Sequence, residues 1–268
     1  MTDPGDCLKW ATLVGTVRAR RCWKGDYVVS IDPEEKRECR KITADGAHLT
    51  VLNLFSTDAP EKQEGLLTAM REIVDSAAFP GWISSTVHAG QDRPGTANFI
   101  QWRSSEDLEA RYADEEFKHR TLPLFGELTT SIRLLQNDVA YTQRHPDLGP
   151  DTEISPDRDD YTVIEVFGVA DGDQADLVDA LGASQDWLVE VPGYRSHTVL
   201  RGLAARGLDG SFVMVYSQWE GKESYDAFRD AAEGERGAAR QKVDARVDSL
   251  ATSRDWNTYR VVHTRSAG

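Results

Sequence analysis

The chain contains one sequence pattern twice, and this repeat limits the possible folds more than any other feature. A Pro-Gly-aromatic triplet at residues 80–82 recurs at 192–194, an offset of 112 (192 − 80). A Gln-Trp pair at 101–102 recurs at 218–219, an offset of 117 (218 − 101). The second copy therefore carries a five-residue insertion between the two motifs (117 − 112). Two copies of one unit predict two similar domains in a single chain of 268 residues.

Each copy predicts the order strand, helix, strand, strand, helix, strand. In the first copy, residues 49–55 are rich in β-branched and aliphatic residues, and a stripe at helical spacing runs from Leu66 to Ala77. A βαββαβ unit of about 100 residues predicts an antiparallel ferredoxin-like sheet with helices on one face. The second copy would cover the bare face of that sheet. We therefore expect an α+β fold in which two fused ferredoxin-like repeats form a pseudo-dimeric α/β barrel.

This repeat predicts four segments. Residues 1–45 form an N-terminal arm, 46–145 the first repeat, 146–160 a linker, and 161–268 the second repeat. The linker is rich in Asp, Pro and Gly, so we expect it to be solvated rather than packed.

Composition disfavours several classes of partner. The net charge of −14 would repel nucleic acid and anionic membranes. No run of 18 apolar residues exists, and the first residues have neither the basic nor the apolar part of a signal peptide. Three cysteines, an odd number, are typical of free thiols in a reducing cytoplasm, where we expect the protein to act. His and Cys do not cluster at ligand spacing, so we expect no bound metal.

A polar row on two predicted strands is the candidate site. Side chains alternate along a strand, so Asn98, Ile100 and Trp102 share one face, and Asn53 and Phe55 share a face of the first strand. If these strands are neighbours, Asn53 lies within reach of the Asn98 row. An amide in an apolar strand needs a hydrogen-bond partner or costs stability. A carbonyl or phenol of a substrate would be such a partner.

The second copy lacks these polar residues. Glu165 takes the place of Asn53, and Val215 takes the place of Asn98, although Trp219 remains. We interpret Glu165 as the partner of an arginine and Trp219 as a packing residue. The first repeat is thus the candidate active copy and the second the candidate structural copy.

On these residues the chain resembles the antibiotic biosynthesis monooxygenase superfamily. Anthrone monooxygenases of that superfamily use an Asn on the first strand, and an Asn and a Trp four residues apart on a later strand; Asn53, Asn98 and Trp102 match these positions. The two-copy architecture with a leader looks most similar to the oxygenases that open the B ring of angucyclines in jadomycin, gilvocarcin and kinamycin-type pathways. That resemblance implies O2 and reduced flavin (FADH2 or FMNH2), supplied by a flavin reductase. No glycine-rich dinucleotide fingerprint accompanies it, so a reaction without any cofactor stays open.

The resemblance also implies roles for individual residues. Asn53 and Asn98 would hydrogen-bond a developing oxyanion, and Trp102 would form an aromatic wall. His119 or His88 is a candidate base, because an imidazole titrates near neutrality. Four further residues are candidates for substrate binding: Phe55, Ile100, His88 and Tyr112. Heme-degrading members of the superfamily carry a histidine about ten residues after the Trp. Tyr112 stands there, so heme is not expected.

The leading hypothesis is an oxygenase that tailors a polycyclic aromatic polyketide, by oxidative C–C cleavage of an angucycline ring with O2 and reduced flavin. One alternative is a cofactor-independent anthrone or quinol monooxygenase. Another is a non-catalytic barrel that binds an aromatic metabolite or acts like a cyclase. The sequence leaves open the substrate, the bond attacked and whether the chain forms a homodimer.

Overall fold

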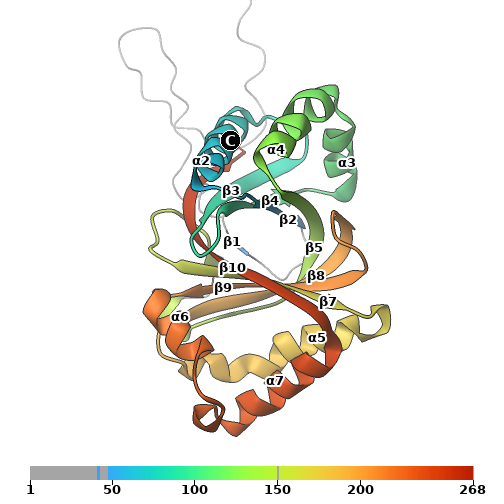
Figure 1. Ribbon diagram of the computed structural model, residues 1–268. Helices are drawn as coiled ribbons and strands as arrows, with labels where there is room; N and C mark the ends of the chain where they lie inside the picture. Colours follow the sequence, from blue (N-terminus) through green and yellow to red (C-terminus); the bar gives the residue numbers. More distant parts are fainter. Residues whose placement is uncertain (1–40, 43–47, 150, 268) are drawn as a thin grey trace, which may run out of the picture. The chain divides into compact units, whose positions relative to one another are not determined.

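The computed structural model describes residues 41–42, 48–149 and 151–267 (Figure 1). The predicted arm, residues 1–45, lies outside the described residues except for Lys41 and Ile42. Within the described residues, eight strands close into one antiparallel barrel in the order β10-β3-β4-β2-β5-β8-β9-β7. Two short strands, β1 (Lys41–Ile42) and β6 (Thr152–Glu153), pair with each other outside the barrel sheet.

Each half of the barrel contributes four strands. They are β2 (Leu49–Ser56), β3 (Trp82–Gly90), β4 (Gly95–Trp102) and β5 (Ser131–Arg144) in the first half, and β7 (Tyr161–Val169), β8 (Tyr194–Arg206), β9 (Ser211–Trp219) and β10 (Ala251–Ser266) in the second.

Helices cover the outer face of each half, on opposite sides of the barrel in Figure 1. The first half carries α2 (Pro60–Ser76), α3 (Ser105–Ala113), the π-helical turn η1 (Phe117–Thr121) and α4 (Leu122–Leu128). The second half carries α5 (Gln174–Leu181), α6 (Lys222–Arg229), α7 (Ala238–Leu250) and the 3-10 turns η3 (Asp171–Asp173), η4 (Ala183–Glu190) and η5 (Glu233–Glu235); a further 3-10 turn, η2 (Pro146–Leu148), follows β5. The α+β fold of two βαββαβ repeats in a pseudo-dimeric barrel is confirmed.

The barrel strands separate two kinds of core. Even-numbered residues of β2, such as Leu52 and Leu54, face the barrel interior and pack with Phe99 of β4. Odd-numbered residues, such as Val51 and Phe55, face outward beneath the helices. This alternation follows from the two-residue period of a strand. Side chains therefore fill most of the barrel interior, and a space lined in part by Leu54, Ile164 and Val166 remains.

Two long strands join the halves. β5 pairs with β2 of its own half and with β8 of the other, and β10 pairs with β7 of its own half and with β3 of the other. Tyr259, near the middle of β10, is paired on both sides, with Thr162 and with Gly90. These two seams leave the sheet without an edge.

The repeated Pro-Gly-aromatic triplet is a turn held close to a helix. Gly81 and Gly193 both have φ = 77°, a left-handed conformation that glycine adopts without strain. A Cβ atom on Gly81 would lie 2.2 Å from the side chain of Asp107, and one on Gly193 would lie 2.3 Å from Ser224. Glycine thus permits both the turn and the approach of α3 and α6.

The glutamine of the repeated Gln-Trp pair supports the β1/β6 ribbon. Gln101 accepts a hydrogen bond from Ser84 and donates one to the Lys41 carbonyl, at 2.8 and 3.1 Å. Gln218 accepts from Ser196 and donates to the Glu153 carbonyl, at 2.6 and 2.9 Å. The same contacts thus occur in both copies, one on each strand of the ribbon.

The segment between the repeats is partly packed, contrary to the expected solvated linker. Ile154 is 2% exposed and belongs to the interior core, together with Ile42 of β1. The buried Asp160 forms ion pairs with Arg158 and Arg195. The charged and turn-forming composition of the linker did not predict this packing, because the packing depends on two residues, the apolar Ile154 and the ion-paired Asp160.

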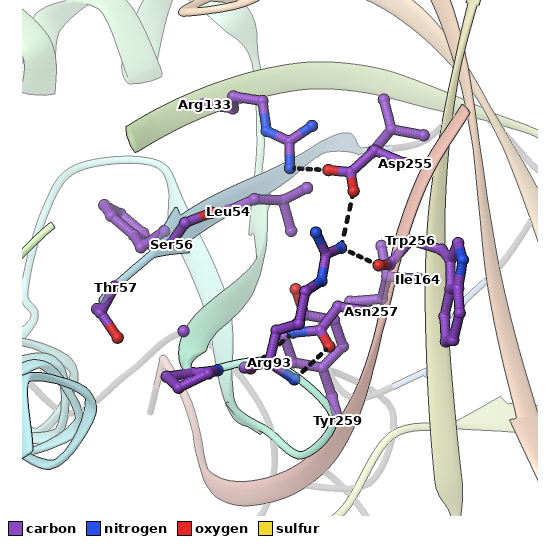
Figure 2. Close-up of a pocket in the computed structure, with 14 residues that line it drawn as sticks. Leu54, Ser56, Thr57, Arg93, Arg133, Ile164, Asp255, Trp256, Asn257 and Tyr259 are labelled. Atoms are coloured by element: carbon purple, nitrogen blue, oxygen red, sulfur yellow. Dashed lines mark hydrogen bonds and ion pairs between the residues drawn. The ribbon is translucent and has the colours of Figure 1, made fainter. Parts of the chain in front are cut away.

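A group of charged residues lies at one end of the barrel, near the start of β5 (Figure 2). Arg133 and Arg93 both donate to Asp255, at 2.6 and 2.7 Å. Asn257 holds the Arg93 backbone by two hydrogen bonds, at 3.1 and 3.0 Å. The strands and turns that supply these residues belong to both halves, so this ionic group ties the halves together beyond the backbone seams.

His88 and Tyr216 form a polar pair inside the barrel. The His88 ring contacts the Thr86 carbonyl at 3.1 Å through Nδ1 and the Tyr216 hydroxyl at 2.9 Å through Nε2. Because a carbonyl can only accept, Nδ1 carries the proton and Nε2 accepts from Tyr216. Burial lowers the pKa of His88 to about 4. The imidazole is therefore neutral in the folded protein at neutral pH.

We expect acid to destabilise the fold in a range to which His88 and the likewise buried His197 both contribute. In the unfolded chain His88 titrates near pH 6.5, whereas in the fold its pKa is about 4. Between these values the unfolded state binds more protons, so stability is highest above pH 6.5 and falls as the pH drops towards 4. Melting temperatures across this range should show the decline. His88→Gln should reduce the decline without abolishing it, because burial also lowers the pKa of His197 to about 4. Replacement of the exposed His119 should leave the decline unchanged, and an unchanged slope in His88→Gln would contradict the assignment.

Candidate functional site

A pocket lies between the outer face of β2–β4 and the helices of the first half. Its cavity has a volume of about 80 Å³ and lies within a wider space of about 620 Å³ that includes open solvent. The lining residues come from β2, β3, β4, α2, α3, η1, α4 and the turn before β3: Asn53, Phe55, Met70, Ile73, Val74, Ala77, Phe79, Trp82, Ser85, Asn98, Ile100, Trp102, Leu108, Arg111, Tyr112, Phe117, Thr121 and Phe125. Most are apolar or aromatic, as is usual for sites that bind small organic molecules.

The sheet brings the two predicted asparagines together. Asn53 and Asn98 are directly opposite each other in the β2/β4 register. Leu134 lies opposite Asn53 on β5, and Val87 lies opposite Asn98 on β3, so apolar residues flank the pair on both sides. Neither flanking residue can hydrogen-bond an amide through its side chain. Any partner for these amides must come from the pocket.

Four polar atoms in the pocket are buried without a hydrogen-bond partner among the described residues. They are Oδ1 of Asn53, Oδ1 of Asn98, Nε1 of Trp102 and the hydroxyl of Tyr112. A buried polar atom without a partner costs about 1–3 kcal/mol. The four atoms include acceptors, a donor and a hydroxyl that can serve as either. Such a set suits a ligand that carries both carbonyl and hydroxyl oxygens.

Aromatic rings form the apolar walls. Phe79 stacks on Trp102 with their ring centroids 6.5 Å apart and an angle of 24° between their planes. Phe55 meets Phe125 edge to face at 5.1 Å. Flat rings arranged around polar atoms favour a planar aromatic ligand.

Burial sets the charge states of the pocket. It raises the pKa of Tyr112 to about 12, so the hydroxyl keeps its proton and can donate a hydrogen bond. Burial also lowers the pKa of the Arg111 guanidinium. The negative charges of Asp114 and Glu116 act in the opposite direction and raise it. Arg111 is the charged side chain among the lining residues that the structure describes.

Six of the eight residues predicted from the sequence line this pocket: Asn53, Asn98, Trp102, Phe55, Ile100 and Tyr112. The structure does not bring the two histidines to it. The side chain of His119 is 76% exposed on η1 and contacts Glu115 at 3.0 Å. His88 faces the barrel interior, on the opposite side of the sheet.

The matching space in the second half has different chemistry. Glu165 pairs with Arg254, which donates to Glu165 Oε2 through Nε at 2.9 Å and through Nη2 at 2.5 Å, so the predicted arginine partner is confirmed. Val215 lines the same space. Three further arginines also line it: Arg229 of α6, Arg236 after η5, and Arg240 of α7. Nε1 of Trp219 donates to the Ser217 hydroxyl at 3.1 Å, whereas Nε1 of Trp102 has no partner among the described residues.

Several wall residues were not predicted, and Arg111 is the most important of them. Leu108, Arg111 and Tyr112 are three and four residues apart on α3, so they share one face of the helix. Leu108 is apolar and buried, so this spacing could have identified Arg111 as a residue on the same face. Phe79, Phe117 and Phe125 lie in turns or short helices where periodicity is a weak guide.

Two absences apply to the described residues alone. In the ranges that the structure covers, no group of three or more His, Cys, Asp and Glu side chains could hold a metal ion. Within those same ranges, no helix has the length and apolar character needed to cross a membrane.

Comparisons with known proteins bear on the family and the fold. The family model described as antibiotic biosynthesis monooxygenase matches residues 160–240, in the second repeat. Tetracenomycin-F1 monooxygenase of Streptomyces glaucescens is 32% identical over 94 residues, which is 31% of this chain and 83% of that protein. A crystal structure described as an anthrone oxidase-like protein is 57% identical, with a TM-score of 0.83 over 85% of this chain and 97% of that one. A structure from Fusobacterium nucleatum, 10% identical over 84% of this chain and 96% of that one, shares the fold with a TM-score of 0.55.

The unpartnered atoms predict an unusual effect on stability. Asn98→Leu should raise the free energy of unfolding by about 1 kcal/mol, because it removes a buried acceptor that has no partner. Gln101→Leu, three residues further along the same strand, should lower it by a similar amount, because it breaks bonds with Ser84 and Lys41. Urea denaturation of both variants tests this. If Asn98→Leu is the less stable of the two, the amide has a structural partner and the assignment is wrong.

Proposed function

The chain belongs to the antibiotic biosynthesis monooxygenase family and is an oxygenase, and we propose that it oxidises a hydroxylated polycyclic aromatic ketone of polyketide origin in the pocket of the first half. One observation carries this proposal. Four buried polar atoms without partners lie between aromatic walls, as a planar ligand with both hydroxyl and carbonyl groups requires. The relatives named for tetracenomycin F1 and for anthrone oxidation support the same substrate class.

The simplest reaction of this class turns an anthrone into a quinone. The substrate loses a proton from its central CH2 group to give an enolate. The enolate transfers an electron to O2, and the resulting radical and superoxide combine into a hydroperoxide at that carbon. Loss of water then gives the quinone. One O2 is consumed; one of its oxygen atoms enters the product and the other leaves as water.

The pocket residues would bind and orient the substrate rather than react with it. Trp102 and Tyr112 donate hydrogen bonds to oxygens that gain negative charge, and the amides of Asn53 and Asn98 bond the hydroxyls. Phe55, Ile100 and Phe79 exclude water, which strengthens each of these interactions. His119 and His88 take no part in this scheme, and the proton leaves to solvent.

This scheme requires neither reduced flavin nor the ring opening of an angucycline. A bound flavin would need donors for its phosphate, and the described lining offers a single guanidinium, that of Arg111, and no glycine turn. The pocket therefore does not fit a resident flavin, and no step is assigned to one. A flavin reductase would be a partner only for the ring-opening reaction.

Turnover of a hydroxyanthrone tests the proposal. Incubation with 1,8-dihydroxy-9-anthrone and O2, without added cofactor, should yield the anthraquinone with one O2 consumed per product, above the rate of autoxidation. Trp102→Phe should lower kcat by about 100-fold, because it removes a donor that stabilises the oxyanion. Asn98→Ala should lower kcat by about the same factor, because it removes the amide that orients a substrate hydroxyl. A parallel incubation with an angucycline and reduced flavin tests ring opening.

The second repeat supplies a matched control. Trp219 occupies the position of Trp102, but its Nε1 donates to Ser217 within the protein. Trp219→Phe should reduce stability and leave kcat close to that of the wild type. Equal losses of kcat in the two tryptophan variants would place the reaction elsewhere, and so would full activity of Trp102→Phe.

A further inference from the structure

Arg111 is a pocket residue to which the proposed chemistry has not yet given a role. Its guanidinium carbon lies 3.9 Å from the centroid of Phe79 and 5.2 Å from that of Phe117. Both rings line the pocket, and Phe79 stacks on Trp102. The Arg111 side chain is 9% exposed. A cation is thus held against the aromatic wall beside the candidate site.

The charge of Arg111 is only partly balanced within the protein. Its single ion pair among the described residues joins Nη1 to Asp114 Oδ1 at 3.2 Å. That oxygen also accepts hydrogen bonds from the backbone of Glu116 and Phe117, and the Asp114 side chain is 49% exposed. The carboxylate is therefore shared and solvated.

Other charged groups near the pocket do not replace Asp114. Glu116 acts on Arg111 at longer range and pairs with Arg120. On the far side, Arg206 lies 4.5 Å from the centroid of Tyr112 and pairs with Glu109. Tyr112 itself stays neutral, since burial raises its pKa to about 12. The strands and α2 contribute no charged side chain to the described lining, so the positive charge inside the pocket is that of Arg111.

We infer that Arg111 is the residue that binds the substrate as its anion, by pairing with the oxygen of the enolate or phenolate. This inference rests on the proposed function, because it assumes a hydroxylated aromatic ketone in this pocket. A guanidinium within ion-pair distance favours the charged form of an acidic group, which makes proton loss to water easier. The described lining of the pocket contains no histidine or carboxylate. Pairing with Arg111 explains how this pocket can nevertheless hold a deprotonated substrate.

The test uses a stable product-like phenol, 1,8-dihydroxyanthraquinone, whose absorption moves to longer wavelength when it ionises. Titration of the probe with and without wild-type protein should show that binding lowers its pKa by about one unit, a tenfold preference for the anion. Arg111→Met keeps the aliphatic stem between the two rings and removes the charge. It should abolish the shift and move the rising limb of the kcat–pH profile, which reports ionisation in the enzyme–substrate complex, to higher pH.

Two further variants separate this effect from a general change in charge. Arg120→Met makes the same change in net charge at a side chain that is 82% exposed, and should leave the probe's shift intact. Asp114→Asn keeps an acceptor for the backbone of Glu116 and Phe117 but removes the competing carboxylate. It should lower the pKa of the bound probe further, a change opposite in sign to that of Arg111→Met.

The outcomes distinguish this inference from the proposed function. If the wild type turns over the hydroxyanthrone while Arg111→Met has the wild-type kcat–pH profile and probe shift, the inference fails and the proposed function stands. If Arg120→Met abolishes the shift as Arg111→Met does, the effect is general electrostatics and the inference again fails. If the wild type neither binds the probe nor oxidises the anthrone, both fail together.

Discussion

The pairing of β10 with strands of both halves is the constraint on which the rest of the structure depends. Residues 251–259 of this strand pair with β7, and residues 259–266 pair with β3. This pairing, with its counterpart between β5 and β8, closes the sheet and turns one face of every strand inward. Most of the inward face is apolar and packed, apart from buried polar groups such as the His88–Tyr216 pair. The pocket with the candidate site lies on the outer face, beneath the helices.

The polar atoms of the candidate site on the outer face of the first half lower the stability of the free protein. Asn53, Asn98, Trp102 and Tyr112 keep polar atoms that nothing in the described protein satisfies, while the rest of the same layer is packed with aliphatic and aromatic side chains. Such atoms reduce the stability of the free protein and are expected where a ligand completes them. The fold tolerates them because the barrel seams, the interior core and the ionic group around Asp255 lie elsewhere.

Local rules were sufficient for the repeat and for the faces of β2 and β4. These strands are regular, so a two-residue alternation correctly placed Asn53, Asn98 and Trp102 together. The same rule fails on β3, where the register shifts between Trp82 and Ser84. The extra residue reverses the alternation, so Ser85 and Val87 face outward with Trp82, and His88 faces inward. A bulge of this kind depends on how strands pair, which one strand's sequence does not show. The orientation of His119 likewise depends on the π-helical turn that carries it, and η1 has no simple periodic pattern.

The different contents of the two matching spaces have a consequence for how such a protein can evolve. In a symmetric dimer of separate chains, every substitution appears in both subunits, so a costly polar site must be built twice. Here the two copies share one chain, and each can change independently. The second copy has replaced the asparagines with Val215 and with an ion pair between Glu165 and Arg254. Duplication and fusion thus allow one half to specialise in binding while the other is free to accumulate stabilising changes, a division of labour that a homodimer of identical subunits does not permit.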